Sequence, residues 1–308
     1  NNLVSDMRSL QILAGFGFNC YSFEVMRDGE LIETLWSAPD FETGTARPSG
    51  SGIPILFPFA GRIRGTRFGF DGREYELTPG DAMGNAIHGF VMNRPWKVIE
   101  QTANRAVGQF QASVVEPALL ERWPSDFRLT VSYEIAGNVL RSELLVENPG
   151  KGPLPFGLGT HPYFRVPLGA KGNRDACRVQ VPVNKVWELV NLLPTGRQFD
   201  AAGKHALAPG MNFSDTHFDD VFTGIGFDNH LATSSISDPG SGRRLVMTFD
   251  DTFRECVVYN PPHRQAICIE PYTCLPNPFE LEQLSIDTGL RVLPPGKSAR
   301  AKIEIRLK

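Results

Sequence analysis

The feature that most constrains the fold is a succession of short strand-type segments separated by clusters of Gly, Pro, Asn and Asp. With 30 Gly and 24 Pro in 308 residues, turn-forming residues interrupt each apolar run after a few positions. The clearest segments alternate polar and apolar residues or stay apolar over strand length, and they are 128–135, 139–148, 177–183, 244–250, 255–260, 265–271 and 299–308. The pattern predicts an all-β chain folded as a large antiparallel β-sandwich.

Helical signals are nearly missing from the sequence. One window, 114–123, has helical spacing, and Pro124 ends it. Strands and helices do not alternate, which argues against a doubly wound sheet. We find no linker, repeat or low-complexity tract, so we expect residues 1–308 to form one domain.

Charge and cysteine content narrow the classes of partner. The net charge is −3, with no basic run, so we expect neither a nucleic-acid partner nor a membrane partner. No apolar stretch is long enough to span a bilayer, and the first residues lack the Lys/Arg head of a secretory signal. The five cysteines form no CxxC pair, which favours a reduced, cytoplasmic protein.

Common cofactor and metal motifs are not found. The G-x-G at 15–17 has no third glycine, and the chain has neither a phosphate-binding GxxxxGK nor a nucleophile-type GxSxG. The six histidines form no HxH, HxxxH or HExxH spacing. We therefore expect no cofactor and no metal.

Two stretches place a titratable residue directly before a Pro-Tyr pair. "THPYF" contains His161, and "IEPYT" contains Glu270. Proline favours an extended conformation for the residue before it and removes a backbone N–H, so His161 is expected where a strand ladder is interrupted. Glu270 follows the apolar run 266–269 and shares a strand face with Cys268. A carboxylate in such a setting is rarely buried unless it has a partner, and desolvation would raise its pKa toward that of a general base.

Three further segments carry candidate site residues. Arg62 follows an apolar-aromatic run, and His88 precedes a glycine within another apolar stretch. Asp219 and Asp220 are adjacent, so on a strand only one of them can face a given site. Each of these residues, taken alone, is also compatible with a purely structural role.

Together, the motifs "FPFAGRI", "IHGF", "GTHPYF", "DDVF" and "CIEPYT" resemble the aldose 1-epimerase (mutarotase) family, in that family's order, over residues 57–273. The ending 289–307 is similar to that family's last strand pair. The resemblance implies a β-sandwich of the galactose mutarotase-like type, with a sugar cleft and without cofactor or metal. It implies that Glu270 is the general base and His161 the general acid. It also implies that Arg62, His88 and Asp219, rather than Asp220, bind the substrate.

The function expected from the resemblance is that of an isomerase interconverting the α and β anomers of an aldose. Glu270 would take the anomeric proton while a His161 kept protonated by the nearby carboxylate gives one to the ring oxygen. The partner would be a small-molecule sugar, and the protein a monomer or homodimer. The galactose-handling branch commonly has Asn where Gly61 stands here.

Two alternatives remain on the same fold. One is a hexose-6-phosphate 1-epimerase, with Arg64 and Arg67 placed to meet a phosphate. The other is a non-catalytic carbohydrate-binding protein, which would have no need to keep both proton-transfer residues.

Overall fold

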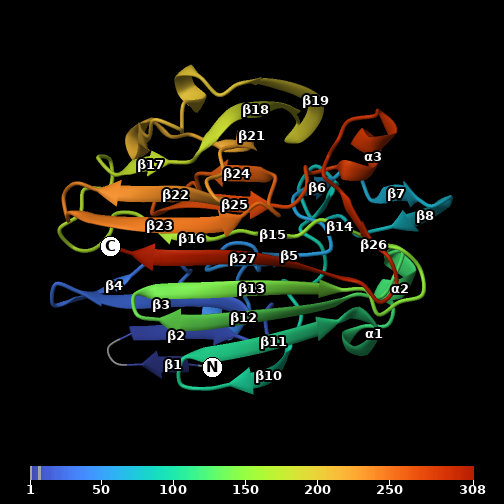
Figure 1. Ribbon diagram of the computed structural model, residues 1–308, viewed down its shortest axis with the longest axis horizontal. Helices are drawn as coiled ribbons and strands as arrows, with labels where there is room; N and C mark the ends of the chain where they lie inside the picture. The colour runs from blue at the N-terminus through green and yellow to red at the C-terminus, as the bar shows by residue number, and fades with distance from the viewer. Residues whose placement is uncertain (1, 6–7) are drawn as a thin grey trace.

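The computed structural model describes residues 2–5 and 8–308, and its main strand pairings are antiparallel. The largest sheet has nine strands and runs across the front of the view in Figure 1. Its strands in spatial order are β10 (Lys97–Gln101), β11 (Arg105–Gln111), β12 (Arg128–Ala136), β13 (Val139–Glu147), β27 (Ser298–Leu307), β23 (Arg243–Asp250), β22 (Leu231–Asp238), β17 (Arg178–Gln180) and β20 (Met211–Asn212).

A second sheet of eight strands carries the candidate site. Seven of its strands form one path, and β16 (Tyr163–Arg165) pairs with β25 beside that path. In spatial order the path is β19 (Leu193–Asp200), β18 (Val183–Val190), β21 (Asp219–Ile225), β24 (Glu255–Tyr259), β25 (Ala266–Tyr272), β15 (Gly159–Thr160) and β5 (Ile55–Leu56).

Smaller elements surround the two sheets. A four-stranded sheet contains β1 (Asn2–Ser5), β2 (Arg8–Leu13), β3 (Asn19–Arg27) and β4 (Glu30–Glu33). Two-stranded pairs are β6 (Arg62–Ile63) with β9 (Ala86–Ile87), β7 (Arg67–Phe70) with β8 (Arg73–Glu76), and β14 (Leu154–Phe156) with β26 (Arg291–Leu293). The α-helices are short: α1 (Ala112–Val115), α2 (Leu119–Arg122) and α3 (Pro278–Gln283).

The main core lies between the two large sheets, and β25 shows how its sequence divides between core and site. Ile267 and Ile269 are buried in the main core together with side chains of the nine-stranded sheet. The alternate residues Ala266 and Cys268 belong to a separate small cluster on the opposite face. Because successive side chains of a strand point to opposite faces, Glu270 lies on the Cys268 side, away from the main core.

The predicted all-β sandwich is confirmed. The predicted segments 128–135, 139–148 and 299–308 coincide with three adjacent strands at the centre of the nine-stranded sheet. Segment 177–183 differs, because it contains β17 and then only the first residue of β18.

The window expected to be one helix, 114–123, instead holds the end of α1 and all of α2. Pro117 lies between these two single turns. A proline has no N–H to continue the helical hydrogen-bond series, so the helix breaks there.

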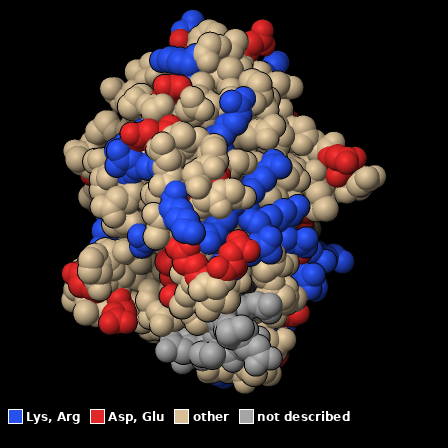
Figure 2. Space-filling model, turned by 90° about the vertical axis from the view of Figure 1, so that its left-hand side faces the viewer, with Lys and Arg blue, Asp and Glu red and all other residues tan. Residues whose placement is uncertain are grey.

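One end of the molecule carries charges of both signs. Figure 2 shows Lys and Arg side chains gathered across the middle of this face, with Asp and Glu side chains beside them. The Arg243–Glu30 ion pair, at 2.9 Å, links the nine-stranded sheet to the four-stranded one. Positive and negative side chains are thus mixed on this face.

Two further observations concern the cysteines and the helices. All five cysteines are buried and unpaired with one another. Among the residues that the structure describes, no helix combines the length and the apolar content needed to cross a bilayer.

Candidate active site

A pocket of about 180 Å³ opens on the face of the eight-stranded sheet that points away from the main core. Its wall includes the five residues to which the family resemblance assigns a catalytic or substrate-binding role: Arg62, His88, His161, Asp219 and Glu270. These residues come from separate parts of the chain, so the fold brings together what the sequence shows only as scattered motifs.

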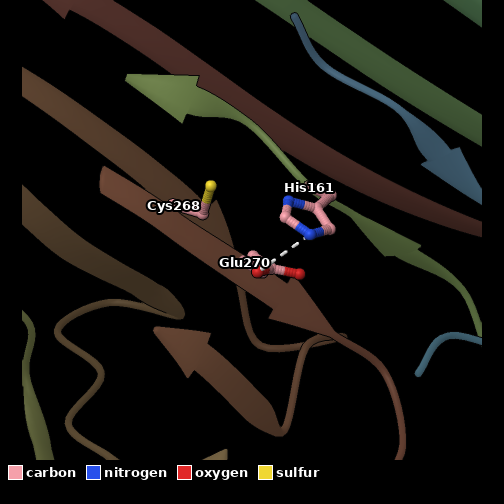
Figure 3. Close-up of side chains that lie close together, drawn as sticks. All are labelled: His161, Cys268 and Glu270. Atoms are coloured by element: carbon pink, nitrogen blue, oxygen red, sulfur yellow. Dashed lines mark ion pairs between the residues drawn. The ribbon is translucent and has the colours of Figure 1, made fainter. Parts of the chain in front are cut away.

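His161 and Glu270 face each other across neighbouring strands. Gly159 pairs with Tyr272 and Tyr163 pairs with Cys268, and these two pairings share one register. The register places His161 directly opposite Glu270. The distance between His161 Nε2 and Glu270 Oε1 is 3.4 Å, and Figure 3 shows the ring and the carboxylate pointing toward one another.

The strand carrying His161 is interrupted at that point. β15 ends at Thr160 and β16 begins at Tyr163, so His161 and Pro162 lie between them. The backbone N–H of His161 donates to the carbonyl of Pro54 at 3.0 Å, which fixes its main chain. The expected interruption of the ladder is therefore present, although β25 itself continues past Glu270 to Tyr272.

The two carboxylate oxygens of Glu270 have different surroundings. Oε2 accepts a hydrogen bond from the Tyr272 hydroxyl at 2.8 Å. Oε1 is buried and has no hydrogen-bond partner, and it is the oxygen nearest His161. Burial raises the pKa of Glu270 well above its usual range, and the Tyr272 hydrogen bond and the charge of Arg62 only partly offset this.

His161 lies in an aromatic environment. Its ring stacks parallel to that of Tyr163, with centroids 4.9 Å apart. The rings of Tyr259 and His88 lie nearly perpendicular to it, with centroids 6.0 Å and 5.6 Å away. Burial lowers the pKa of His161 to about 3, and the positive charge of Arg47 acts in the same direction. The expectation that a nearby carboxylate keeps His161 protonated is therefore wrong for this pocket, because the loss of solvation on burial favours the neutral imidazole.

Burial disfavours charge on both members of the pair. A neutral imidazole beside a protonated Glu270 carboxyl is therefore the form of the pair that burial favours. Moving that proton to His161 generates a carboxylate base and an imidazolium acid without any exchange with solvent. The arrangement can thus accept one proton and donate another within a small polar pocket.

Arg62 and His88 are held side by side by the β6–β9 pair. Arg62 pairs with Ile87 in this short ladder, so His88 follows directly after its end. The Nε of Arg62 donates to Asp81 Oδ2 at 2.9 Å, which orients the guanidinium. The Nδ1 of His88 accepts from the Gly61 N–H at 3.3 Å, so a neutral His88 carries its proton on Nε2.

His88 has a strained backbone. Its φ is 63°, in the left-handed region that non-glycine residues seldom adopt. The next residue, Gly89, has a φ of 73°, and a Cβ there would lie 2.0 Å from the Phe57 carbonyl oxygen. The tight turn therefore requires Gly89, and burial lowers the pKa of His88 well below its usual value, which keeps it a neutral donor. Strain of this kind is often found at functional sites.

The structure separates the two adjacent aspartates. Asp219 lines the pocket, whereas Asp220 lies 3.7 Å from Nε2 of His205. Asp219 remains accessible at the mouth of the pocket, and the loss of solvation there raises its pKa. Of the two, only Asp219 is placed to contact a bound molecule.

Some pocket residues were not found from the sequence. Tyr272 could have been found, because it lies two positions after Glu270 on the same strand face. Arg47 could not, because it is an exposed residue in an irregular loop, where it donates from Nε to the Ser49 hydroxyl at 3.1 Å.

The arginines named for a phosphate lie elsewhere. Arg64 donates to Glu280 at 2.7 Å, and Arg67 lies within 4.0 Å of Glu74 and Glu76. Neither arginine lines the pocket. Arg47 is therefore better placed than either to meet an anionic group there.

Comparison with known proteins gives a consistent result. The family model described as aldose 1-epimerase matches residues 14–306. The uncharacterized protein YihR of Escherichia coli strain K12 is 25% identical over 249 residues, which cover 76% of this chain and 74% of YihR.

Two solved structures share the fold. A galactose mutarotase-like protein from Clostridium acetobutylicum superposes with a TM-score of 0.89 at 24% identity, covering 100% of this chain and 94% of that protein. The galactose 1-epimerase of Lactobacillus acidophilus NCFM gives a TM-score of 0.76 at 18% identity, covering 100% and 93%. At these identities the likeness establishes the fold alone.

Proposed function

Because this chain belongs to the aldose 1-epimerase family, we propose that it interconverts the α and β anomers of an aldose by acid–base opening and closing of the sugar ring. The observation that carries the proposal is the facing pair of His161 and Glu270 at 3.4 Å in a pocket that also holds Arg62, His88 and Asp219.

Glu270 acts as the general base in the proposed reaction. Its Oε1 is the oxygen without a protein partner, so it is free to take the proton of the anomeric hydroxyl. The positive charge of Arg62 favours the carboxylate form that this step requires. The carboxylate arises when the proton held by Glu270 passes to His161.

His161 acts as the general acid. As an imidazolium it gives a proton to the ring oxygen while the bond between C1 and that oxygen breaks, which leaves an open-chain aldehyde. Rotation about C1–C2 presents the other aldehyde face, and reversal of the two roles closes the ring as the other anomer. Each positioned proton-transfer group contributes about 10²–10⁴-fold.

The remaining polar residues bind and orient the sugar. The neutral His88 offers an N–H on Nε2, the Nη groups of Arg62 offer further donors, and Asp219 offers an acceptor. Donors and an acceptor around a small pocket suit a ring that carries several hydroxyl groups.

The test follows the optical rotation of freshly dissolved α-D-glucose and α-D-galactose with wild-type protein and with Glu270→Gln. Wild type should accelerate the decay for at least one sugar, and Glu270→Gln should remove nearly all of the acceleration. Glu255→Gln is the matched control, since Glu255 is a buried glutamate on the neighbouring strand that does not line the pocket. Equal activity of wild type and Glu270→Gln would reject the assigned base.

A hexose 6-phosphate is the second candidate substrate, and Arg47 at the pocket is the observation that favours it. The same assay with α-D-glucose 6-phosphate compares wild type with Arg47→Gln. If Arg47→Gln loses acceleration with glucose 6-phosphate but not with free glucose, the phosphorylated sugar is favoured as the substrate. If wild type accelerates none of these sugars but binds them, a carbohydrate-binding role replaces the proposed activity.

A further inference from the structure

Beside the catalytic pair lies a third side chain with a metal-binding atom. Cys268 precedes Glu270 by two positions on β25, and its sulfur lies on the same side of the strand, as Figure 3 shows. The sulfur, one ring nitrogen of His161 and one oxygen of Glu270 all lie within 4.8 Å of one another. All three residues are buried.

The chemistry of this set is that of a zinc site. Zinc in proteins is held by thiolate, imidazole and carboxylate ligands in tetrahedral geometry. With ordinary bond lengths of 2.0–2.2 Å, its nitrogen and oxygen ligands stand about 3.4 Å apart. The separation between His161 Nε2 and Glu270 Oε1 is 3.4 Å.

The sulfur requires a modest adjustment. Tetrahedral zinc places a sulfur and a nitrogen or oxygen ligand about 3.6 Å apart, so no pair here has to close by more than roughly 1.2 Å. Hard ions such as Mg²⁺ prefer an all-oxygen shell and are poorly served by a thiolate.

A second observation also points to a ligand. Glu270 Oε1, the oxygen nearest His161 Nε2, is a buried atom without a hydrogen-bond partner in the protein. Buried polar atoms are nearly always paired, so each such atom needs an explanation. The sugar of the proposed function accounts for Oε1, but an ion placed among the three side chains would also satisfy it.

We propose that Cys268, His161 and Glu270 form a binding site for Zn²⁺ that overlaps the sugar site. The pocket supplies solvent to the fourth coordination position, as in zinc sites with three protein ligands. Because a thiolate and a carboxylate are ligands, binding displaces two protons into solvent, that of the Cys268 thiol and the one held by Glu270, and no oxidation or reduction is involved.

Zinc and sugar exclude each other in this arrangement. The ion occupies Glu270 Oε1, the same atom that takes the anomeric proton. Zn²⁺ is consequently an inhibitor that competes with the sugar. This consequence rests on the proposed function, whereas binding of the ion does not.

Binding is tested with Co²⁺, a spectroscopic substitute for Zn²⁺, on reduced protein free of any histidine tag. Wild type should show a near-ultraviolet thiolate-to-cobalt band that saturates at one ion per chain and disappears when Zn²⁺ is added. Cys268→Ala should lose the band and weaken Zn²⁺ binding by more than the roughly tenfold cost of losing an outer-shell partner. Cys256→Ala, a buried cysteine on β24 outside the cluster, should retain both.

A second measurement works on wild type alone and so does not depend on how a variant folds. Zn²⁺ should slow mutarotation, the effect should be relieved by more sugar or by a chelator, and an equal concentration of Mg²⁺ should have no effect. A wild type without a thiolate–cobalt band would overturn the proposed site even if mutarotation were rapid. A saturating band without mutarotation would support the site and instead count against the proposed function.

Discussion

Glu270 stands directly across from His161, on a strand whose neighbour is interrupted at that residue, with 3.4 Å between Oε1 and Nε2. Neither prolyl residue beside them, Pro162 or Pro271, can donate an N–H to the ladder. The two side chains therefore meet where two rigid strands lie side by side but their hydrogen-bonded pairing is incomplete. Such a position holds a proton-transfer pair more firmly than a loop does.

The Tyr272 hydroxyl should be needed to orient Glu270. We expect Tyr272→Phe to lower kcat/KM roughly 10- to 100-fold, the usual worth of a hydrogen bond to a charged group. The same change should raise the pKa of Glu270 further, because the lost hydrogen bond stabilised the carboxylate. A pH–rate profile would show the alkaline limb moving to higher pH. Tyr133→Phe, a buried tyrosine on the nine-stranded sheet, should change neither quantity.

The pH dependence of activity should not show the titration of a histidine with an ordinary pKa. The working pair holds one proton, which it keeps until the pH exceeds the raised pKa of Glu270. It gains a second proton only near the lowered pKa of His161, about 3. We therefore expect the pH profile of kcat/KM to show no acid limb at the ordinary histidine pKa of about 6.5, and its alkaline limb to be set by the raised pKa of Glu270. A decline centred on pH 6.5 would contradict this assignment.

The adjacent aspartates should differ in effect. Asp219→Asn should lower kcat/KM by about tenfold or more, through loss of a charged acceptor for a sugar hydroxyl. It should also lower the pKa of Glu270, since the charge of Asp219 helps to raise it. Asp220→Asn is the control and should stay within about twofold, because its side chain turns toward His205. Steady-state kinetics on both variants would decide, and equal losses would contradict the assignment.

Glu255 should make stability depend on pH. It is 2% exposed, accepts a hydrogen bond from Trp187 Nε1 at 2.8 Å, and has a pKa that burial raises to about 7. The folded protein thus holds a proton that the unfolded chain releases near pH 4.5. Holding this proton adds on the order of 3 kcal/mol to the free energy of unfolding below about pH 4.5. This stabilisation is lost as the pH rises through 7.

Urea unfolding of wild type and Glu255→Gln at pH 5 and pH 8 measures the effect. The variant should lose less stability between the two pH values than wild type does, because Gln does not ionise and its carbonyl still accepts from Trp187. Equal pH dependence in both proteins would show that Glu255 titrates normally.

The fold class follows from local pattern, whereas the pairing of strands does not. Alternation along 128–135 and 139–148 is enough to predict β12 and β13, because the two faces of a strand differ in burial. The interruption at Pro117 was visible in the sequence but was outweighed by the apolar spacing around it. Nothing local indicates that β13 pairs with β27, since that contact joins distant parts of the chain.

The candidate site was predictable to the extent that its residues carry signals in sequence. Proline beside His161 and Glu270 indicated both members of the pair, and strand alternation placed Cys268 on the Glu270 side. The neutrality of His161 was not predictable, because it depends on how completely the folded pocket excludes water. The position of Arg47 in the pocket was also not predictable, because a loop has no periodicity that indicates where its side chains point.

The division of β25 into two faces has an evolutionary consequence. Ile267 and Ile269 hold the two sheets together, while Cys268, Glu270 and Tyr272 lie on the side that carries the chemistry. Substitutions on one face therefore alter stability, and substitutions on the other alter what is bound or transformed. A lineage built on this strand can diversify its ligands without redesigning the scaffold that supports them.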